Sequence, residues 1–443
     1  MATPYKVQLS VEDTGAVKFQ DPTAESAAKV SDLLQKNHDN HHIFFNEEGF
    51  HNHIVHGLLS LYGLGAPASV LQRHFDTNAS YQRPPVKVEE KIIQDMSDPD
   101  NFKKYLGKEE YYRDFLLFFE QEMEKKGWQN VLNEYVFAGD ERADGMLVRM
   151  YAGFLHPLIH LGFGVEFKQP AIVAEALAQA AVHDAWIGDL LLGAEQANKA
   201  QGPTKKTLPE LLSDIHMDKK LTEGVQWEDA NKIRDGLLQR VSQDMIKHAS
   251  QWSVSSTTLE EKTAEMINAA VYFTAGAQHP PKQVKFDFFY MHSVNCSVFF
   301  TTFNAQTWLS SESKVRLLAW KGYLDLAMYA SRGSPELLME EIVGFVPKVQ
   351  EAERSSWTGV LRRLFEFDDD GHAIKLGRAV RNGQVVCQKF EDKEWCKIKD
   401  WQWEKVENMV VDSVEDTGQN WVRNTGFEKA WEGFEDRPRS TRL

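Results

Sequence analysis

Six of the fifteen histidines in the chain lie between residues 38 and 56: His38, His41, His42, His51, His53 and His56. Histidine is the commonest metal ligand and has an unperturbed pKa close to neutrality, so the group predicts metal binding or proton transfer. Any single one of these histidines could instead be a surface residue or a helix-capping residue with no role in chemistry. On a helix over residues 49–62, His53 and His56 share a face with small residues, and we expect His56 to point inward.

A second pair, His156 and His160, is spaced four residues apart in an apolar stretch. This spacing places both rings on one helix face, beside the small residues Gly153, Pro157 and Gly164, where a ligand has room to approach. Because a proline disfavours helical geometry at the residue before it, His160 is the better metal ligand of the two. The alternative is a pair of hydrogen-bonded structural histidines, since a buried imidazole without partners is costly.

A third candidate, His292, lies in a phenylalanine-rich stretch. On a helix its face also carries Phe288, Phe289, Phe299 and Phe303. Such a wall of rings suits a flat aromatic ligand. The alternative is an ordinary aromatic core.

The fourth candidate group follows a run of aspartates, Asp368–Asp370, that is typical of a helix start. His372 and Lys375 come next and share a helix face. A buried lysine has a lowered pKa and becomes a nucleophilic amine. A neutral amine can also add carbon dioxide to form a carbamate, which would be an anionic oxygen ligand for a metal. The alternative is an exposed lysine that pairs with one of the aspartates.

The elements that must position these residues are predicted to be mainly α-helical. From about residue 23 to about residue 380 the apolar residues recur with a helical period. The clearest helical ranges are 109–127, 145–160, 172–192, 227–250, 258–273, 286–308, 311–330 and 335–346. We expect an N-terminal arm over residues 1–22 with a small hairpin, and a single large α-helical catalytic domain over residues 23–443.

The end of that domain, from about residue 381, is predicted to be a polar, tryptophan-rich segment. Asn382 and Gly383 are expected to form a turn, followed by an edge strand over residues 384–390. The fold class is thus mainly α with a few peripheral short strands.

Composition excludes several functional classes. The 443 residues carry a net charge of −15, without a block rich in lysine and arginine, which argues against a nucleic acid or an anionic membrane as partner. No apolar stretch reaches the roughly 18 residues of a membrane span, and the N-terminal sequence lacks the layout of a signal peptide. We therefore expect a cytoplasmic protein.

Several common catalytic motifs are absent from the sequence. It has no HExxH helix, no GxxxxGK[ST] loop and no GxSxG turn, which excludes the usual zinc protease, nucleoside triphosphatase and hydrolase signatures. The paired glycines of the chain also lack the third glycine of a dinucleotide-binding fingerprint. A Rossmann domain for flavin or nicotinamide is therefore unsupported.

With these residues in view, the chain resembles the questin oxidase-like family of fungal polyketide pathways. The resemblance covers about residues 25–380 and is carried by the stretches 37–46, 49–56, 61–66, 154–162, 289–292 and 370–375. The first three of these stretches form one block, which is the most specific part of the resemblance. The family is associated with oxidative opening of an anthraquinone ring, which leads to benzophenone or seco-anthraquinone products.

The resemblance also raises the question of the cofactor. Some members of the family are described as Baeyer–Villiger-type and NADPH-linked, yet this chain has no recognisable dinucleotide site. Non-haem iron takes histidine nitrogen and hard oxygen ligands and keeps positions open for dioxygen. Histidines drawn from several helices fit such a metal better than an organic cofactor.

We therefore expect His56, His160, His292 and His372 to converge on one iron ion, with Lys375, as a carbamate, supplying an anionic oxygen ligand. His53 and His156 are expected to act in proton transfer.

The expected substrates are dioxygen and a polycyclic aromatic in a phenol or hydroquinone form, packed against Phe288, Phe289, Phe299 or Phe303. The central ring of that substrate would be oxidised and cleaved. One alternative keeps the substrate and uses NADPH and flavin for a Baeyer–Villiger insertion. A second alternative is a non-enzymatic helical scaffold whose histidines are structural.

Overall fold

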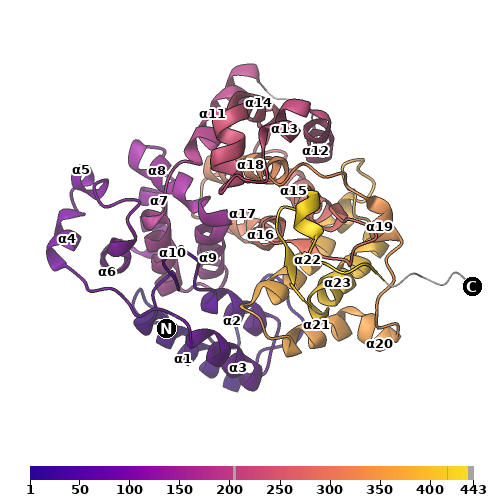
Figure 1. Ribbon diagram of the computed structural model, residues 1–443. Coiled ribbons are helices and arrows are strands. Elements are labelled where there is room, and N and C mark those ends of the chain that lie inside the picture. The colour runs from indigo at the N-terminus through magenta and orange to yellow at the C-terminus, as the bar shows by residue number, and fades with distance from the viewer. Residues whose placement is uncertain (203–205, 417, 438–443) are drawn as a thin grey trace, which may run out of the picture. The chain divides into compact units, whose positions relative to one another are not determined.

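Helices make up nearly all of the regular structure in residues 1–202, 206–416 and 418–437, which are the residues that the computed structural model describes (Figure 1). The predicted fold class, mainly α with a few short strands, is confirmed. No helix in these residues is both long enough and apolar enough to cross a membrane.

The chain divides into two compact units, each of which is assembled from three separate stretches. The first unit consists of residues 1–188, 298–314 and 368–378. The second unit consists of residues 189–297, 315–367 and 379–443. The expected division into an arm over residues 1–22 and one catalytic domain over residues 23–443 stays a prediction.

The first unit holds most of the N-terminal helices. Its α-helices are α1 (Ala24–Asn40), α2 (Ile54–Gly63), α3 (Ala68–Ala79), α4 (Glu90–Asp95), α5 (Pro99–Phe102), α6 (Tyr112–Lys126), α7 (Trp128–Tyr135), α8 (Glu141–Met150), α9 (His156–Glu166), α10 (Pro170–Val182) and α17 (Phe299–Ala305). Two short 3₁₀ turns are η1 (Glu109–Tyr111) and η2 (Gly153–Leu155).

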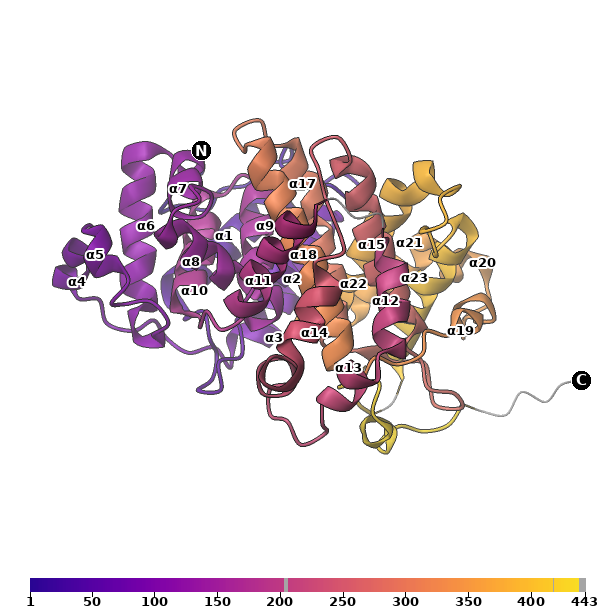
Figure 2. The same ribbon diagram turned by 90° about the horizontal axis from the view of Figure 1, so that it is seen from above.

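Helices α9 and α10 form the core of this unit. They pack against each other, with α6 on α10 and with α2 and α17 on α9 (Figure 2). Every residue of α10 is buried, and so is every residue of α9 except Glu166. Pro170 suits the first turn of α10, and its many alanines are strong helix formers that allow close approach on all sides.

The second unit contains the remaining helices and the strands. Its elements are α12 (Leu208–Met217), α13 (Lys219–Gly224), the π-helix η3 (Lys232–Leu238), α14 (Gln239–Ala249), α15 (Leu259–Gly276), β1 (Phe286–Asp287), α16 (Tyr290–Ser297), α19 (Met339–Val343), α20 (Ala352–Ser355), α21 (Trp357–Glu366), η4 (Gln388–Phe390), α23 (Asp400–Glu415), β2 (Trp421–Val422) and η5 (Glu428–Trp431). Strands β1 and β2 pair in parallel, with Phe286 opposite Trp421. Three helices have residues in both units: α11 (Gly188–Gln201), α18 (Ser311–Ser331) and α22 (His372–Cys387).

Several of the long predicted helices are interrupted; the range 172–192, for example, is divided between α10, which ends at Val182, and α11, which begins at Gly188. The helix expected over residues 145–160 ends at Met150, because Gly153, Phe154 and Leu155 all have positive φ angles, of 53°, 55° and 70°. The helix expected over residues 286–308 begins only at Tyr290, since Phe286 and Asp287 form strand β1.

The predicted turn at Asn382 and Gly383 and the strand over residues 384–390 are wrong. Helix α22 continues to Cys387 and is followed by the 3₁₀ turn η4. A Cβ atom on Gly383 would lie 2.6 Å from the ring of Trp403. The glycine therefore serves close packing inside a helix, and does not mark a turn.

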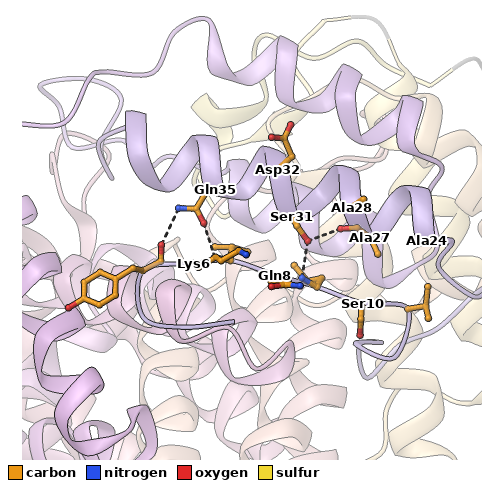
Figure 3. Close-up of a pocket in the computed structure, with 13 residues that line it drawn as sticks. Lys6, Gln8, Ser10, Ala24, Ala27, Ala28, Ser31, Asp32 and Gln35 are labelled. Carbon is orange, nitrogen blue, oxygen red and sulfur yellow. Dashed lines mark hydrogen bonds between the residues drawn. The ribbon is translucent and has the colours of Figure 1, made fainter. Parts of the chain in front are cut away.

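The hairpin predicted near the N-terminus is also absent; residues 1–22 contain only an isolated bridge between Thr3 and Lys6. The backbone amide of Val7 donates to Gln35 of α1 at 2.8 Å, and that of Leu9 donates to Ser31 at 2.8 Å. Figure 3 shows this segment beside α1, where the two line a groove of roughly 860 Å³. The alternating pattern of the segment thus reflects docking on a helix.

Candidate active site: a buried histidine cluster

The first unit brings together histidines from three parts of the chain. We use the name histidine cluster for the following buried residues: His53 and His56 at the start of α2, His156 and His160 on α9, and His372 with Lys375 on α22. The ring centres of His53 and His156 are 4.9 Å apart, and those of His53 and His372 are 4.5 Å apart. The close approach of residues so distant in sequence marks a candidate active site.

Asp370 joins two rings of the cluster. Nδ1 of His53 lies 3.0 Å from one of its carboxylate oxygens, and Nδ1 of His372 lies 2.5 Å from the other. Burial by itself raises the pKa of Asp370, but the charges and hydrogen bonds of His372 and His53 hold that pKa well below its ordinary value. An ionised carboxylate only accepts hydrogen bonds, so both histidines donate from Nδ1.

The turn before α22 positions Asp370. Asp369 accepts hydrogen bonds from the backbone amides of Gly371 at 2.7 Å and Ala373 at 2.8 Å, as a helix-capping carboxylate does. Burial and the adjacent charge of Asp370 raise the pKa of Asp369 to about 7. The aspartate run therefore begins the helix, as predicted, and at the same time directs one carboxylate at two histidines.

His156 is held by the interrupted backbone that precedes α9. Its Nδ1 lies 2.5 Å from the carbonyl oxygen of Gly153, which can only accept, so this ring also carries its proton on Nδ1. His156 has helical backbone angles although Pro157 follows it. The left-handed conformations of Phe154 and Leu155 are costly for residues other than glycine, and such strain clusters at functional sites.

Three histidines of the cluster could hold a metal ion together. One ligand nitrogen from each of His53, His156 and His372 lies within 4.8 Å of the other two. Their Nδ1 atoms bond to Asp370 or to the carbonyl of Gly153, so a metal ion would be held through Nε2 of each ring. Metal-binding histidines usually donate their second N–H to a carboxylate or a carbonyl in this way.

Lys375 is buried with 3% of its surface exposed. Its Nζ has no hydrogen-bond partner among the described residues. Burial lowers the pKa of Lys375 to about 8, although Asp370 and Asp369 act in the opposite direction. At neutral pH a larger share of this amine is therefore neutral than in an exposed lysine, although most of it stays protonated.

His56 and His160 belong to a second chain of contacts. Nε2 of His56 lies 3.2 Å from Nδ1 of His160, and Nε2 of His160 lies 2.7 Å from a carboxylate oxygen of Glu175 on α10. Burial, followed by the charge of Lys375, lowers the pKa of His56 well below its ordinary value. Nδ1 of His56 has no partner among the described residues.

Beyond Glu175 the contacts continue to His38 on α1 and Glu120 on α6. Nδ1 of His38 lies 2.6 Å from Glu175, and its Nε2 forms an ion pair with Glu120 at 3.0 Å. Burial opposes a charge on His38, yet its bonds to the two carboxylates raise its pKa to about 10. Burial likewise opposes the charge of Glu175, but its hydrogen bonds to His160 and His38 lower its pKa to about 2. A protonated histidine thus lies between two buried carboxylates.

The other candidates from the sequence lie in both units. His292 is buried in the second unit, where its Nδ1 lies 2.6 Å from the carbonyl oxygen of Phe288. The rings of Phe288 and Phe289 meet edge to face in that unit. In the first unit Phe299 packs against Phe163 with ring centres 4.7 Å apart, and Phe303 packs against Phe300.

The structure therefore groups the predicted residues differently from the expected ligand set. His372 and Lys375 lie in the histidine cluster as expected, together with His53 and His156, for which proton transfer was expected. His56 and His160 are adjacent and contact each other. The roles of these residues, and of His292, stay predictions.

Sequence reasoning missed the carboxylates. The sequence marks Asp370 only as part of a helix start and gives no role to Glu175 or Glu120, while His38 is noted only as one of six clustered histidines. A signal for Glu175 exists in the sequence, because it is the one charged residue in the alanine-rich stretch 170–182. A lone carboxylate in a helix that is apolar on every side needs a buried partner.

The chain belongs to the questin oxidase-like family, whose pattern matches residues 50–380. It is 38% identical to the Baeyer-Villiger monooxygenase dmxR6 of Cryptosporiopsis sp. (strain 8999), over 96% of this chain and 97% of that protein. It is 34% identical to a questin oxidase of Aspergillus terreus, over 97% of this chain and 98% of that protein. A third relative is the oxidoreductase AflY of Aspergillus parasiticus, 39% identical over 96% of this chain and 86% of that protein. The protein is accordingly an oxidoreductase.

The ion pairs of His38 lead to a prediction about stability and pH. The folded-state pKa of His38, about 10, lies above the usual 6.5. The ion pairs of His38 therefore stabilise the folded protein at low pH, and this stabilisation is lost as the pH rises towards 10. We expect His38→Ala to lower the free energy of unfolding by about 3–5 kcal/mol at pH 7, since it leaves two buried carboxylates without their cation. Urea unfolding between pH 7 and 10 should show that this loss shrinks with rising pH.

The half-buried neighbour His41 provides the matched control for His38, because among the described residues its ring forms a hydrogen bond only to the uncharged side chain of Asn37 and stacks on Phe75. We expect His41→Ala to cost about 1 kcal/mol or less, with no change over this pH range. If His38→Ala lowers the free energy of unfolding by the same amount at every pH up to 10, His38 is neutral in the folded protein.

Proposed function

We propose that the protein is an oxygenase that opens the central ring of an anthraquinone-type polyketide with dioxygen, using non-haem iron bound in the histidine cluster. The observation that carries the proposal is the convergence of His53, His156 and His372, each with its Nδ1 bonded to an oxygen acceptor. The proposal also draws on the names of the relatives, which include a questin oxidase and several Baeyer-Villiger oxidases.

The positions of the ring protons support a cation between His53 and His156. The Nε2 atoms of His53 and His156 approach to 2.7 Å. With both Nδ1 protons donated elsewhere, two lone pairs face each other, and that arrangement is repulsive unless a cation lies between them. Burial, followed by the charge of Lys375, lowers the pKa of His53 to about 3, which argues against a proton in that role. A metal ion would satisfy both nitrogens after a small separation of the rings.

These proton positions favour His53, His156 and His372 as the metal-binding residues. The set expected from the sequence, with His56, His160, His292 and His372, is the alternative, and Lys375 belongs to both. The contact between His56 and His160 is satisfied without a cation, because one ring can donate to the other. Bound iron would supply the ability to bind dioxygen and to transfer electrons to it one at a time.

Residues beside the cluster suit an oxygenated aromatic substrate. The ring of Phe163 stacks on His56 with ring centres 5.4 Å apart, and Phe299 meets Phe163 edge to face. Gly162 permits this approach, because a Cβ atom there would lie 2.2 Å from the ring of Phe299. The guanidinium of Arg378 lies 5.6 Å from Phe163 and 5.9 Å from Phe299. A flat, electron-rich ring with phenolic oxygens matches these surroundings.

The reaction balances without an external reductant when the substrate enters as a hydroquinone. Two electrons and two protons of the hydroquinone reduce one oxygen atom to water, while the other atom is inserted beside the carbonyl carbon to give a lactone. Hydrolysis of that lactone gives a benzophenone carboxylic acid. Direct incorporation of both oxygen atoms gives a product of the same composition, so mass alone does not separate the two routes.

Isotope labelling separates these routes. We expect the enzyme, supplied with a hydroquinone substrate under ¹⁸O₂, to place two labelled atoms in the ring-opened acid, because the iron route incorporates dioxygen directly. One labelled atom, together with one from solvent water, would instead indicate a Baeyer–Villiger insertion followed by hydrolysis. Mass spectrometry of the product makes the distinction.

Iron content tests the site independently of turnover. We expect about one iron ion per chain in the purified protein, and strong loss of iron in His53→Ala and His372→Ala, because each removes a ligand nitrogen. Elemental analysis provides the measurement. The matched control is His183→Ala, which removes another histidine from the first unit, one that contacts His51.

The same measurement decides between the two ligand sets. Iron loss in His56→Ala and His160→Ala, with retention in His53→Ala, would establish the set expected from the sequence. A wild-type protein that retains no metal under mild purification would contradict the iron proposal altogether.

Lys375 provides a further test. A buried amine with a lowered pKa is suited to add carbon dioxide, and the carbamate would offer the metal an anionic oxygen. We expect Lys375→Ala to lose activity, and a short carboxylate such as acetate or propionate to restore part of it. Lys375→Arg is the control, because it keeps a positive charge and cannot form the carbamate. Unchanged activity in Lys375→Ala would refute the carbamate.

A Baeyer–Villiger reaction with flavin and NADPH is the second candidate, favoured by the names of several relatives. It acts on the same class of substrate. A purified protein that carries flavin absorbance, and that consumes NADPH only in the presence of substrate, would favour this candidate over iron.

A further inference from the structure

Arg378 is a buried cation of the first unit, three residues after Lys375 on α22. Its side chain is 1% exposed, and its Nη2 forms an ion pair with Oε1 of Glu166 on α9, whose side chain is 3% exposed. The same Oε1 accepts a hydrogen bond at 2.5 Å from the backbone amide of Ala16. A Cβ atom on Gly15 would lie 2.8 Å from Nη2. The protein itself thus surrounds this end of the guanidinium.

The other nitrogens of the guanidinium lack such contacts. Nε and Nη1 of Arg378 are buried and form no hydrogen bond with any of the described residues. An arginine side chain stays protonated in proteins and carries five N–H donors in a rigid plane. The two nitrogens therefore cannot avoid the cost of burial by losing a proton. A buried donor without an acceptor costs free energy, which the protein recovers when a ligand supplies the acceptor.

Two phenylalanine rings lie beside these donors. The guanidinium carbon of Arg378 is 5.6 Å from the ring centre of Phe163 and 5.9 Å from that of Phe299. Phe163 also stacks on His56, with ring centres 5.4 Å apart. Phe163 therefore connects Arg378 with the histidine cluster, and the surroundings of the two nitrogens are aromatic.

Buried polar groups continue the histidine cluster by one helical turn. Ser60 follows His56 by four residues on α2, and Arg378 follows Lys375 by three on α22, so each pair shares a helix face. The side-chain oxygen of Ser60 is also buried and forms no hydrogen bond with the described residues. One turn advances about 5.4 Å, a distance that a fused aromatic frame of several rings spans. An aromatic ligand at the cluster can therefore extend to this second row of polar groups.

We propose that Arg378 is a specificity-determining residue whose Nε and Nη1 donate hydrogen bonds to an oxygen substituent of the aromatic substrate. Glu166 is a positioning residue, because its ion pair with Nη2 holds the guanidinium plane and leaves the other two nitrogens for the ligand. Glu166 also balances the charge of Arg378, so a neutral carbonyl or phenol oxygen suffices as the acceptor. The inference rests on the proposed function for the substrate class, and it requires neither iron nor turnover.

Such a site selects against the bare hydrocarbon. A site that hydrogen-bonds a group of its substrate rejects an analogue without that group, because its own polar atoms are then buried and unpaired. Anthracene would leave Nε and Nη1 of Arg378 without acceptors, whereas a hydroxyanthraquinone with the same three-ring frame supplies them. Arg378 therefore sets the ratio of the two affinities. An arginine that serves only the fold would affect both affinities alike.

Equilibrium dialysis measures this ratio, with anthracene and 1,8-dihydroxyanthraquinone as the two probes. The full-length protein is used as purified and without dioxygen, so that neither probe is oxidised by it. The decisive comparison is between Glu166→Gln and the double variant Glu166→Gln/Arg378→Met. The glutamine oxygen can keep both hydrogen bonds that Oε1 of Glu166 accepts, and the double variant leaves no buried carboxylate unpaired.

We expect the wild type and Glu166→Gln to prefer 1,8-dihydroxyanthraquinone over anthracene. The double variant should lose at least about 10-fold of this preference, as expected for hydrogen bonds from a charged donor. Its affinity for anthracene should change little, because methionine is apolar and adaptable. Arg142→Met is the control for the loss of an arginine in the first unit; Arg142 pairs with Glu134 and lies over the ring of Tyr135. We expect it to leave both affinities unchanged.

An equal loss of affinity for both probes in the double variant, or an unchanged ratio, would overturn the inference. If the double variant does not fold, Arg378→Lys replaces it, because lysine can still pair with Glu166 but lacks the guanidinium plane. An unchanged ratio in Arg378→Lys would overturn the inference as well. A wild type that binds neither probe would remove the proposed substrate class together with the inference. A protein without iron that shows the expected ratios would contradict only the iron proposal.

Discussion

The first unit depends on one constraint: the buried carboxylates Asp370 and Glu175 and the histidines around them must be paired away from water. Asp370 meets this constraint for His53 and His372, and Glu175 meets it for His160 and His38. An unpaired charge at either carboxylate would cost several kcal/mol. The packing of α2, α9 and α22 is therefore specified by polar contacts as much as by apolar ones, and the same contacts set the protonation of the rings in the site.

The two carboxylates act on different parts of the histidine cluster. Asp370 accepts from Nδ1 of His53 and of His372, so that the lone pair of each neutral ring lies on Nε2. Glu175 contacts His160 and His38, and His160 in turn contacts His56. One carboxylate thus orients two rings of the proposed metal site, and the other holds a buried line of histidines together.

The residues that the sequence could identify are those whose own type carries the signal. Helical periodicity predicted α6, α15 and α18 closely, and histidine spacing selected His53, His56, His156, His160 and His372. Their partners could not be predicted, because Asp370 and Glu175 gain their roles only through contacts across distant helices. Local signals also misled: Gly383 resembles a turn residue, yet it lies within α22 because the ring of Trp403 needs the space. Residues 384–390 consequently continue as a helix and a 3₁₀ turn.

The first unit takes its last stretch from residues 368–378, and this stretch supplies Asp370, His372 and Lys375. During synthesis on the ribosome, the N-terminal helices emerge long before these three residues do. Until then His53 lacks Asp370, whereas Glu175, His160, His38 and their further partners Glu120 and His56 are already present. The contacts of Asp370 with His53 and His372 can therefore form only after residues 368–378 have emerged, and the proposed metal site is assembled later than the helices that surround it. A chain without this stretch would present His53 and His156 without Asp370, His372 and Lys375.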